Sequence, residues 1–391
     1  MRLAQRMEGI GTETAFEAAA RARALEAKGV SVVHLEIGEP DFDTPANVRQ
    51  AAARALERGR THYAPYPGTP ELRAAIAADA TARKGFPVDP ERVFVTVGGK
   101  GVMLYAIEAL VDPGDEVLVP DPGYPIYESL VRFMGGTPVP VPIRQSNGFR
   151  LDVEELASLV TPRTRMLVIN SPANPSGGVL TRGDLEAIAE IAQRHDLAVL
   201  ADEIYGRILY EGEHVSLASL PGMAERTIVL DGFSKTYAMT GWRLGYAIVP
   251  ESLAFAFGRL LINSVSCVST FEQDAAVEAL TGPQDAVDAM VAEFRARRDL
   301  IVDGLNAIPG ITCLRPQGAF YVFPDVSGTG LKGAEFADRL LYEAGVSALA
   351  GTAFGGVGVD HIRFSYANSQ ENIRIALERT ATFVAGLKVP A

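Results

Sequence analysis

The chain has 391 residues, 48% of them apolar and 21% charged, and this length exceeds one typical core and predicts two domains. Its formal net charge of −12 argues against nucleic acid or an anionic membrane as the main partner, because both require a broad basic face. Two cysteines, five histidines without a metal-ligand spacing and no apolar stretch of membrane-span length predict a cytoplasmic protein with neither a disulfide framework nor a metal site.

An N-terminal arm is expected before the first domain. Residues 13–28 alternate alanine with charge at helical spacing, and residues 30–37 are typical of a short strand that ends at the segment Gly-Glu-Pro-Asp. A helix over residues 46–58 leads to a loop rich in proline and glycine, which contains Tyr63. Thr69-Pro70 then predicts the N-cap and first position of a third helix.

Residues 93–249 repeat a short apolar strand followed by a helix-length segment. This alternation predicts an α/β fold with a mainly parallel sheet covered by helices on both faces. Ligands bind such sheets at the carboxyl ends of the strands. The loops expected at those ends follow Val97, Val119, Ile169, Ala201 and Leu230.

The sequence changes in character after residue 282. A long helix to about residue 305, strands near 311–314, 320–323 and 361–365, a helix near 334–344 and a closing helix are expected. This part predicts a smaller α+β domain that packs with the N-terminal arm. We therefore predict a large domain over residues 46–285 and a small domain formed by residues 1–45 and 286–391.

Lysine is rare, and its placement indicates the chemistry. The six lysines are Lys28, Lys84, Lys100, Lys235, Lys332 and Lys388. Only Lys100 and Lys235 stand where an apolar strand meets a loop of small residues, and the other four are expected at the surface.

Lys235 follows a strand, with Ser234 beside it and Arg243 eight residues later. A carbonyl cofactor condenses with a neutral amine, and burial or nearby cations make a lysine neutral. Ser234 and Arg243 are suitable donors to a phosphate. Together they predict pyridoxal 5′-phosphate bound as a Schiff base on Lys235; the alternative is an ordinary loop lysine.

Polar residues in the other strand-end loops fit the same cofactor. Asp202 is the candidate partner of a protonated ring nitrogen, or else a turn cap. Asn174 and Tyr205 are candidate donors to the ring oxygen. Tyr124 either stacks on the ring or belongs to the core.

Two further sites are predicted for anions. The backbone amides of the Gly-Gly-Lys turn, at Gly99 and Lys100, stand at a helix start where a phosphate can approach. Arg363 ends an apolar strand and needs a partner, which is either a substrate carboxylate or a structural salt bridge.

The ordered set of motifs resembles a known family. The motifs are Gly38-Glu39-Pro40-Asp41-Phe42, Tyr63, Gly98-Gly99-Lys100, Asn174-Pro175-Ser176-Gly177, Asp202-Glu203-Ile204-Tyr205, Ser234-Lys235, Gly241-Trp242-Arg243, Gly318-Ala319-Phe320-Tyr321 and Arg363-Phe364-Ser365. In this order they resemble the class I aminotransferases of the aspartate aminotransferase superfamily, which are pyridoxal-phosphate enzymes of fold type I. The resemblance covers nearly the whole chain.

The resemblance implies roles beyond those derived above. Lys235 forms the Schiff base and moves the proton, while Arg363, Asn174 and the Gly38 backbone hold the substrate. Tyr63 reaches the phosphate of a partner subunit in a homodimer. Lys100 meets an acidic side chain in some relatives, but the same Gly-Gly-Lys turn occurs in relatives with broad or aromatic preferences.

The expected activity is transfer of the amino group from an L-amino acid to a 2-oxo acid in amino acid metabolism. The main alternative is a carbon–sulfur β-lyase on the same fold, because both reactions need a carbanion at the α-carbon. A cofactor-sensing regulator is a third reading. It would need a separate DNA-binding module, which we do not expect here.

Overall fold

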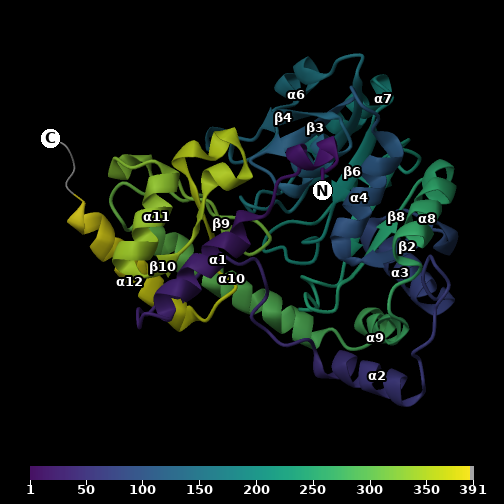
Figure 1. Cartoon of the computed structure of the whole chain (residues 1–391), viewed down its shortest axis with the longest axis horizontal. Coiled ribbons are helices and arrows are strands. Elements are labelled where there is room, and N and C mark those ends of the chain that lie inside the picture. The colour runs from purple at the N-terminus through teal and green to yellow at the C-terminus, as the bar shows by residue number, and fades with distance from the viewer. Residues whose placement is uncertain (388–391) are drawn as a thin grey trace.

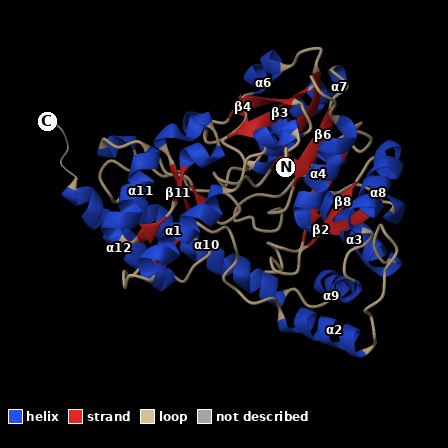
Figure 2. Ribbon diagram, in the orientation of Figure 1, coloured by secondary structure: helices blue, strands red, loops and turns tan. Residues whose placement is uncertain are grey.

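The computed structural model describes residues 1–387, and a seven-stranded sheet forms its larger part (Figures 1 and 2). The strand order is β2-β8-β7-β6-β5-β3-β4. The strands are β2 (Val93–Val97), β3 (Glu116–Asp121), β4 (Thr137–Pro142), β5 (Thr164–Asn170), β6 (Ala198–Asp202), β7 (Thr227–Gly232) and β8 (Leu244–Ile248). Only β8 runs opposite to the other six strands, so the predicted mainly parallel sheet is confirmed.

Helices cover both faces of this sheet, as predicted (Figure 2). They are α2 (Ala46–Glu57), α3 (Pro70–Lys84), α4 (Gly98–Leu110), α5 (Ile126–Phe133), α6 (Val153–Leu159), α7 (Arg182–Arg194), α8 (Glu251–Val265) and α9 (Thr270–Thr281). Successive side chains of a strand point to opposite faces of the sheet, so β7 contributes side chains to the core on each face. Ile228 and Leu230 join the core beneath α4 and α8, while Val229 joins the core beneath α3 and α9.

A smaller α+β part lies beside the large sheet (Figure 1). It contains α1 (Thr14–Glu26), α10 (Asp285–Asn306), α11 (Gly333–Ala344) and α12 (Gln370–Gly386), with the strands β1 (Val33–His34), β9 (Tyr321–Val322), β10 (Val346–Ser347), β11 (Leu349–Ala350) and β12 (Ile362–Ser365). Strand β1 of the N-terminal arm pairs with β10, so the two ends of the chain join here. The division into residues 46–285 and the remainder stays a prediction.

The structure corrects several expected elements. The strand expected over residues 30–37 is only β1, because its partner β10 is equally short. The strand expected at 311–314 is absent from the described residues, where a single bridge joins Thr312 to Asp325. Helices α8 and α9 were not predicted, although Leu253, Phe257 and Leu261 follow the four-residue spacing of a buried helix face. Within residues 1–387, no helix combines the length and apolar character that crossing a bilayer requires.

Gly245 of β8 packs closely against the backbone at the start of α4. A Cβ at this position would lie 2.6 Å from the carbonyl carbon of Gly98 and 2.8 Å from the amide nitrogen of Gly99. Backbone atoms cannot rotate away, so we expect Gly245→Ala to lower the free energy of unfolding by about 1–3 kcal/mol in urea titrations. Gly241→Ala is the control, because no atom lies within 4 Å of its Cβ. Equal stability of the two variants would contradict this packing.

Candidate active site

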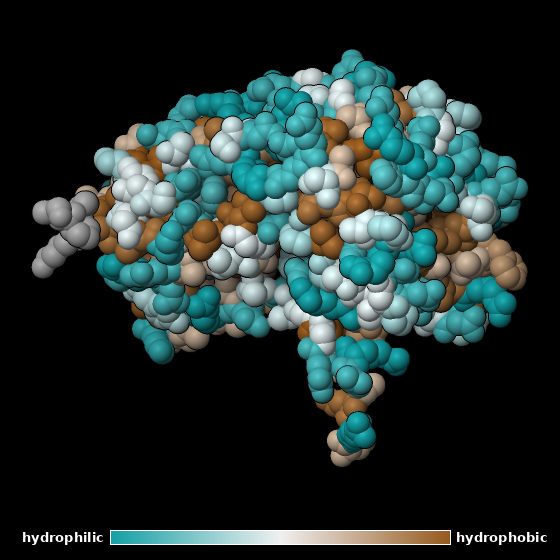
Figure 3. All heavy atoms as spheres, turned by 90° about the horizontal axis from the view of Figure 1, so that it is seen from above, coloured by the Kyte–Doolittle hydropathy of each residue, from teal (hydrophilic) through white to brown (hydrophobic). Residues whose placement is uncertain are grey.

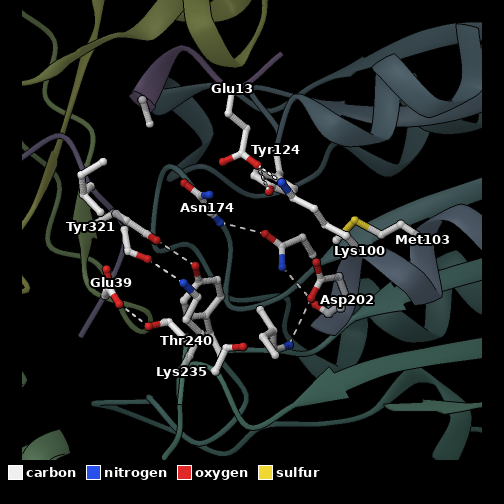
Figure 4. Close-up of a pocket in the computed structure, with 18 of the residues that line it drawn as sticks. Glu13, Glu39, Lys100, Met103, Tyr124, Asn174, Asp202, Lys235, Thr240 and Tyr321 are labelled. Carbon is white, nitrogen blue, oxygen red and sulfur yellow. Dashed lines mark hydrogen bonds and ion pairs between the residues drawn. The ribbon is translucent and has the colours of Figure 1, made fainter. Parts of the chain in front are cut away.

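A cavity of about 470 Å³ lies at the carboxyl ends of β5, β6 and β7, against the smaller part of the chain (Figure 4). Eleven of the twelve site residues predicted from sequence line it: Gly38, Gly99, Lys100, Tyr124, Asn174, Asp202, Tyr205, Ser234, Lys235, Arg243 and Arg363. The twelfth, Tyr63, does not line the cavity and is 91% exposed. The structure thus brings together residues that are more than 300 positions apart in the chain.

Lys235 stands just beyond the end of β7, with its amine in the cavity. Its Nζ donates a hydrogen bond of 2.5 Å to the carbonyl oxygen of Gly38. Burial lowers the pKa of Lys235 to about 8; Glu39 opposes this effect, and Arg363 and Arg243 add to it. An amine with this pKa is partly neutral near neutral pH, as nucleophilic and general-base chemistry requires.

Asp202 ends β6 as a buried carboxylate. Tyr127 donates a hydrogen bond of 2.6 Å to its Oδ2, and the amide of Ile204 donates one of 3.1 Å to its Oδ1. Burial raises the pKa of Asp202 to about 6, because the charged form is poorly solvated there. Asp202 forms no ion pair with any residue in the described range, so a cationic ring nitrogen would supply the charge that the protein does not.

Arg363 of β12 is a buried cation that has no carboxylate partner in the described part of the chain. Its Nη1 donates to Asn174 Oδ1 at 3.2 Å and its Nη2 donates to the Glu36 carbonyl oxygen, but its Nε has no partner among residues 1–387. The guanidinium carbon also lies 4.6 Å from the centre of the Tyr321 ring. Burial lowers the pKa of Arg363. No salt bridge from the described residues satisfies this side chain, which is therefore suited to an anionic ligand.

The start of α4 and Arg243 lie together at the place where the sequence predicts a phosphate. Gly98 begins α4 with a φ of +66°, and a Cβ there would lie 2.3 Å from Arg243 Nη2. The guanidinium is fixed by a 2.8 Å hydrogen bond from Nη1 to the Thr240 carbonyl oxygen. The first amides of a helix have no partner within the helix, so Gly99 and Lys100 present free N–H groups. Ser234 lines the same cavity.

The aromatic residues of the site are held by hydroxyl contacts. Tyr205 and Tyr321 share a hydrogen bond of 2.8 Å between their hydroxyl groups. Tyr124 donates one of 2.6 Å to Glu13 Oε1. The backbone N–H of Asn174 donates a hydrogen bond of 2.8 Å to Asn170 Oδ1. These contacts join the loop after β6 to β9 and the loop after β3 to the N-terminal arm around one cavity.

Comparisons with known proteins agree with this geometry. The family model described as aminotransferase class I and II matches residues 30–379. The chain is 44% identical to an arginine–pyruvate transaminase of Pseudomonas aeruginosa, covering 98% of this chain and 97% of the relative. It is also 44% identical to an aspartate/prephenate aminotransferase of Thermus thermophilus, covering 97% and 98%. The solved aspartate aminotransferase of Rhizobium meliloti superposes with a TM-score of 0.95 at 39% identity, covering 99% and 100%.

Lys84 was predicted at the surface, and this prediction is wrong. Its Nζ lies 2.7 Å from Glu203 Oε2 and 2.8 Å from Asp231 Oδ2, and its side chain is 2% exposed. Burial opposes the charge of Lys84, but Asp231 and Glu203 raise its pKa to about 12. Its position at a helix end before a Gly-Phe-Pro turn is typical of an exposed lysine, so the local sequence gave no sign of burial. Of the other lysines expected at the surface, Lys388 lies outside the described residues.

The Lys84 cluster supports the two strands that carry the site, because Glu203 follows Asp202 and Asp231 precedes Lys235 by four residues. We expect Lys84→Met to cost roughly 3–5 kcal/mol of unfolding free energy, since it removes the lysine that two buried carboxylates share. Urea unfolding of the cofactor-free protein measures this loss. The control is Lys332→Met, because the Lys332 side chain is 66% exposed and its ion pair with Asp360 contributes little.

The pH dependence of the unfolding free energy is a second test of the Lys84 cluster. Despite its burial, Lys84 and His214 lower the pKa of Glu203 to about 2, from an ordinary value of 4.5. Glu203 therefore contributes stability that is fully present above about pH 4.5 and is lost as the pH falls toward 2. The difference between wild type and Lys84→Met should shrink over that range. A difference that is constant with pH would show that lost packing, not lost charge, causes the effect.

Proposed function

Because the chain belongs to the class I and II aminotransferases, which use pyridoxal 5′-phosphate, we propose that the cavity around Lys235 is its active site. The protein is an aminotransferase that moves the amino group of an L-amino acid to a 2-oxo acid. The assignment of the site rests on three groups that meet in one cavity. Lys235 has a lowered pKa, and within the described residues Asp202 has no cationic partner and Arg363 has no carboxylate partner.

The residues present fit the cofactor at each of its groups. Asp202 would face the ring nitrogen, and the phosphate would be held by Ser234, Arg243 and the amides of Gly99 and Lys100. Tyr124 would lie against the ring, with Asn174 and Tyr205 at its oxygen. When bound, the cofactor withdraws electrons from the substrate α-carbon, which makes the α-proton removable.

Lys235 is the residue that moves this proton. Two lysines of the described residues line the cavity, but the Lys100 side chain is 49% exposed and its amine is paired with Glu13, so Lys235 has the free amine. Lys235 is half-buried and has a pKa of about 8, so it can accept a proton from the α-carbon and then give it back. The carbonyl oxygen of Gly38 orients this amine.

The substrate carboxylate would be held by Arg363, Asn174 and the backbone near Gly38. A carboxylate would satisfy the unpaired Nε of Arg363 and compensate its buried charge. The named relatives act on arginine, on aspartate and prephenate, and on aromatic amino acids, at 43–44% identity to this chain. Overall sequence identity therefore does not show which substrate side chain this protein prefers. The β-lyase alternative gains no support, because all of these relatives are aminotransferases.

We expect a cytoplasmic homodimer in which Tyr63 completes the partner's site. Tyr63 is 91% exposed and outside its own cavity, although it was predicted to contact a phosphate. Phe255 and Ile262 of α8 are also 76% and 46% exposed. Apolar patches interrupt the polar surface that is seen from above (Figure 3). Large apolar side chains left exposed in this way are typical of a surface that a second subunit covers.

Replacement of the reacting amine tests the site. We expect Lys235→Ala to lower the transamination rate at least about 10³-fold, because it removes both the nucleophile and the proton carrier. The cofactor-loaded protein is mixed with single L-amino acids without an acceptor, and cofactor absorbance and 2-oxo acid are followed. Lys332→Ala should react as the wild type does. Transamination by Lys235→Ala at the wild-type rate would refute the assignment, and sustained ammonia release by the wild type would indicate a lyase.

Complementation tests the shared site. Tyr63→Ala and Lys235→Ala chains are co-expressed with different tags, and the mixed dimer is isolated. If Tyr63 crosses the interface, one of the two sites contains both intact residues, and we expect about half of the wild-type activity per dimer. The two homodimeric variants are the controls. A mixed dimer no more active than its parents would place Tyr63 at the site of its own chain.

A further inference from the structure

Glu13 enters the cavity from the N-terminal arm, although sequence reasoning gave it no role. It immediately precedes α1, and its side chain is 18% exposed. Its Oε1 accepts the 2.6 Å hydrogen bond from the Tyr124 hydroxyl and pairs with Lys100 Nζ. Figure 4 shows the carboxylate directed at the Lys100 amine beside the Tyr124 ring. Glu13 is thus paired with Lys100, the lysine that would otherwise face the substrate.

The cations of the cavity have separate uses. Among the described residues that line it, they are Lys100, Lys235, Arg243 and Arg363. In the proposed function Arg243 meets the phosphate, Arg363 meets the α-carboxylate and Lys235 carries out the chemistry. Lys100 is therefore the cation that remains for a charged substrate side chain, and Glu13 already neutralises it.

A charged substrate side chain would have to break this pair. An acidic group must displace Glu13 from Lys100 and then remain beside Glu13 and Glu39, which both line the cavity. A cationic group must displace Lys100 in the same way. An uncharged side chain leaves the pair intact and meets apolar lining from Ala15, Phe16, Ile37 and Met103. Like-charge contacts discriminate against wrong partners even where the pair itself adds little stability.

We infer that Glu13 determines substrate specificity: by holding Lys100 it excludes acidic side chains and favours L-amino acids with uncharged ones. This inference rests on the proposed function and deepens it. The Glu13–Lys100 pair is partly exposed, so the discrimination is modest, on the order of tenfold. Glu13 does not touch the reacting atoms, so its replacement should alter preference without abolishing turnover.

Glu13→Gln is the direct test, because it removes the charge and retains the size and the acceptor for Tyr124. The probes are succinate, a dicarboxylate, and 3-phenylpropionate, a monocarboxylate with an uncharged side chain; neither has an amino group to transfer. Their dissociation constants are measured by calorimetry with the cofactor-loaded enzyme. We expect succinate to bind on the order of tenfold more tightly to the variant and 3-phenylpropionate to bind unchanged. Glu17→Gln, an exposed acid one turn further along α1, should change neither.

Lys100→Met is an independent test in case the Glu13→Gln substitution changes more than the local charge. This variant leaves the Glu13 carboxylate uncompensated, so kcat/KM for L-arginine should rise on the order of tenfold and succinate should bind more weakly than to the wild type. An unchanged kcat/KM for L-arginine in Lys100→Met would show that the charge of Glu13 does not act on the substrate side chain, and would overturn the inference. An unchanged affinity of Glu13→Gln for succinate would overturn it also.

The two proposals fail in different ways. If the wild type converts no L-amino acid, the proposed function fails whatever the variants bind. If the wild type transaminates and the ratio of kcat/KM for L-aspartate to that for L-phenylalanine is the same in Glu13→Gln, only the role of Glu13 fails. Unchanged thermal unfolding midpoints would show that the variants keep the wild-type fold.

Discussion

The site depends on the burial of charges that the chain itself does not compensate. Burial raises the pKa of Asp202 to about 6, lowers that of Lys235 to about 8 and leaves the Nε of Arg363 without a partner in the described range. Each group is thereby destabilised in its charged form. A ligand with a cationic ring nitrogen, a reactive carbonyl and a carboxylate would relieve all three, so that binding of cofactor and substrate also stabilises the fold.

The contrast between Lys84 and Lys235 shows that burial alone does not make a lysine reactive. Both side chains are enclosed, yet the pKa of Lys84 rises to about 12 and that of Lys235 falls to about 8. The difference lies in their partners: Lys84 has two carboxylates within 2.8 Å, whereas Lys235 hydrogen-bonds a backbone carbonyl. A fully paired cation fixes the loops that hold Asp202 and Lys235, and an unpaired amine remains free for chemistry.

The sequence predicts those parts of the fold and site whose signal is local. The apolar strands β5, β6 and β7 each run directly into a polar loop, and parallel strands bring such loops to one edge of the sheet; this places Asn174, Asp202 and Lys235 together. The burial of Lys84 and the entry of Glu13 into the cavity come from long-range packing. Glu203 and Asp231 lie more than 100 residues beyond Lys84, so no window around that lysine contains its partners.

The residues that react and the residues that are proposed to select the substrate lie in different parts of this architecture. The reacting groups lie at the ends of buried strands, where a change of side chain disturbs the sheet core and the carboxylate network beneath it. Glu13 and Phe16 approach the same cavity from a segment at the other end of the chain, which packs on the surface of both parts. Substitutions in that segment alter the charge around Lys100 without moving Lys235 or Asp202. The relatives that are 43–44% identical to this chain are named for substrates that range from arginine to aspartate and aromatic amino acids, so substrate choice varies while the reaction type stays the same.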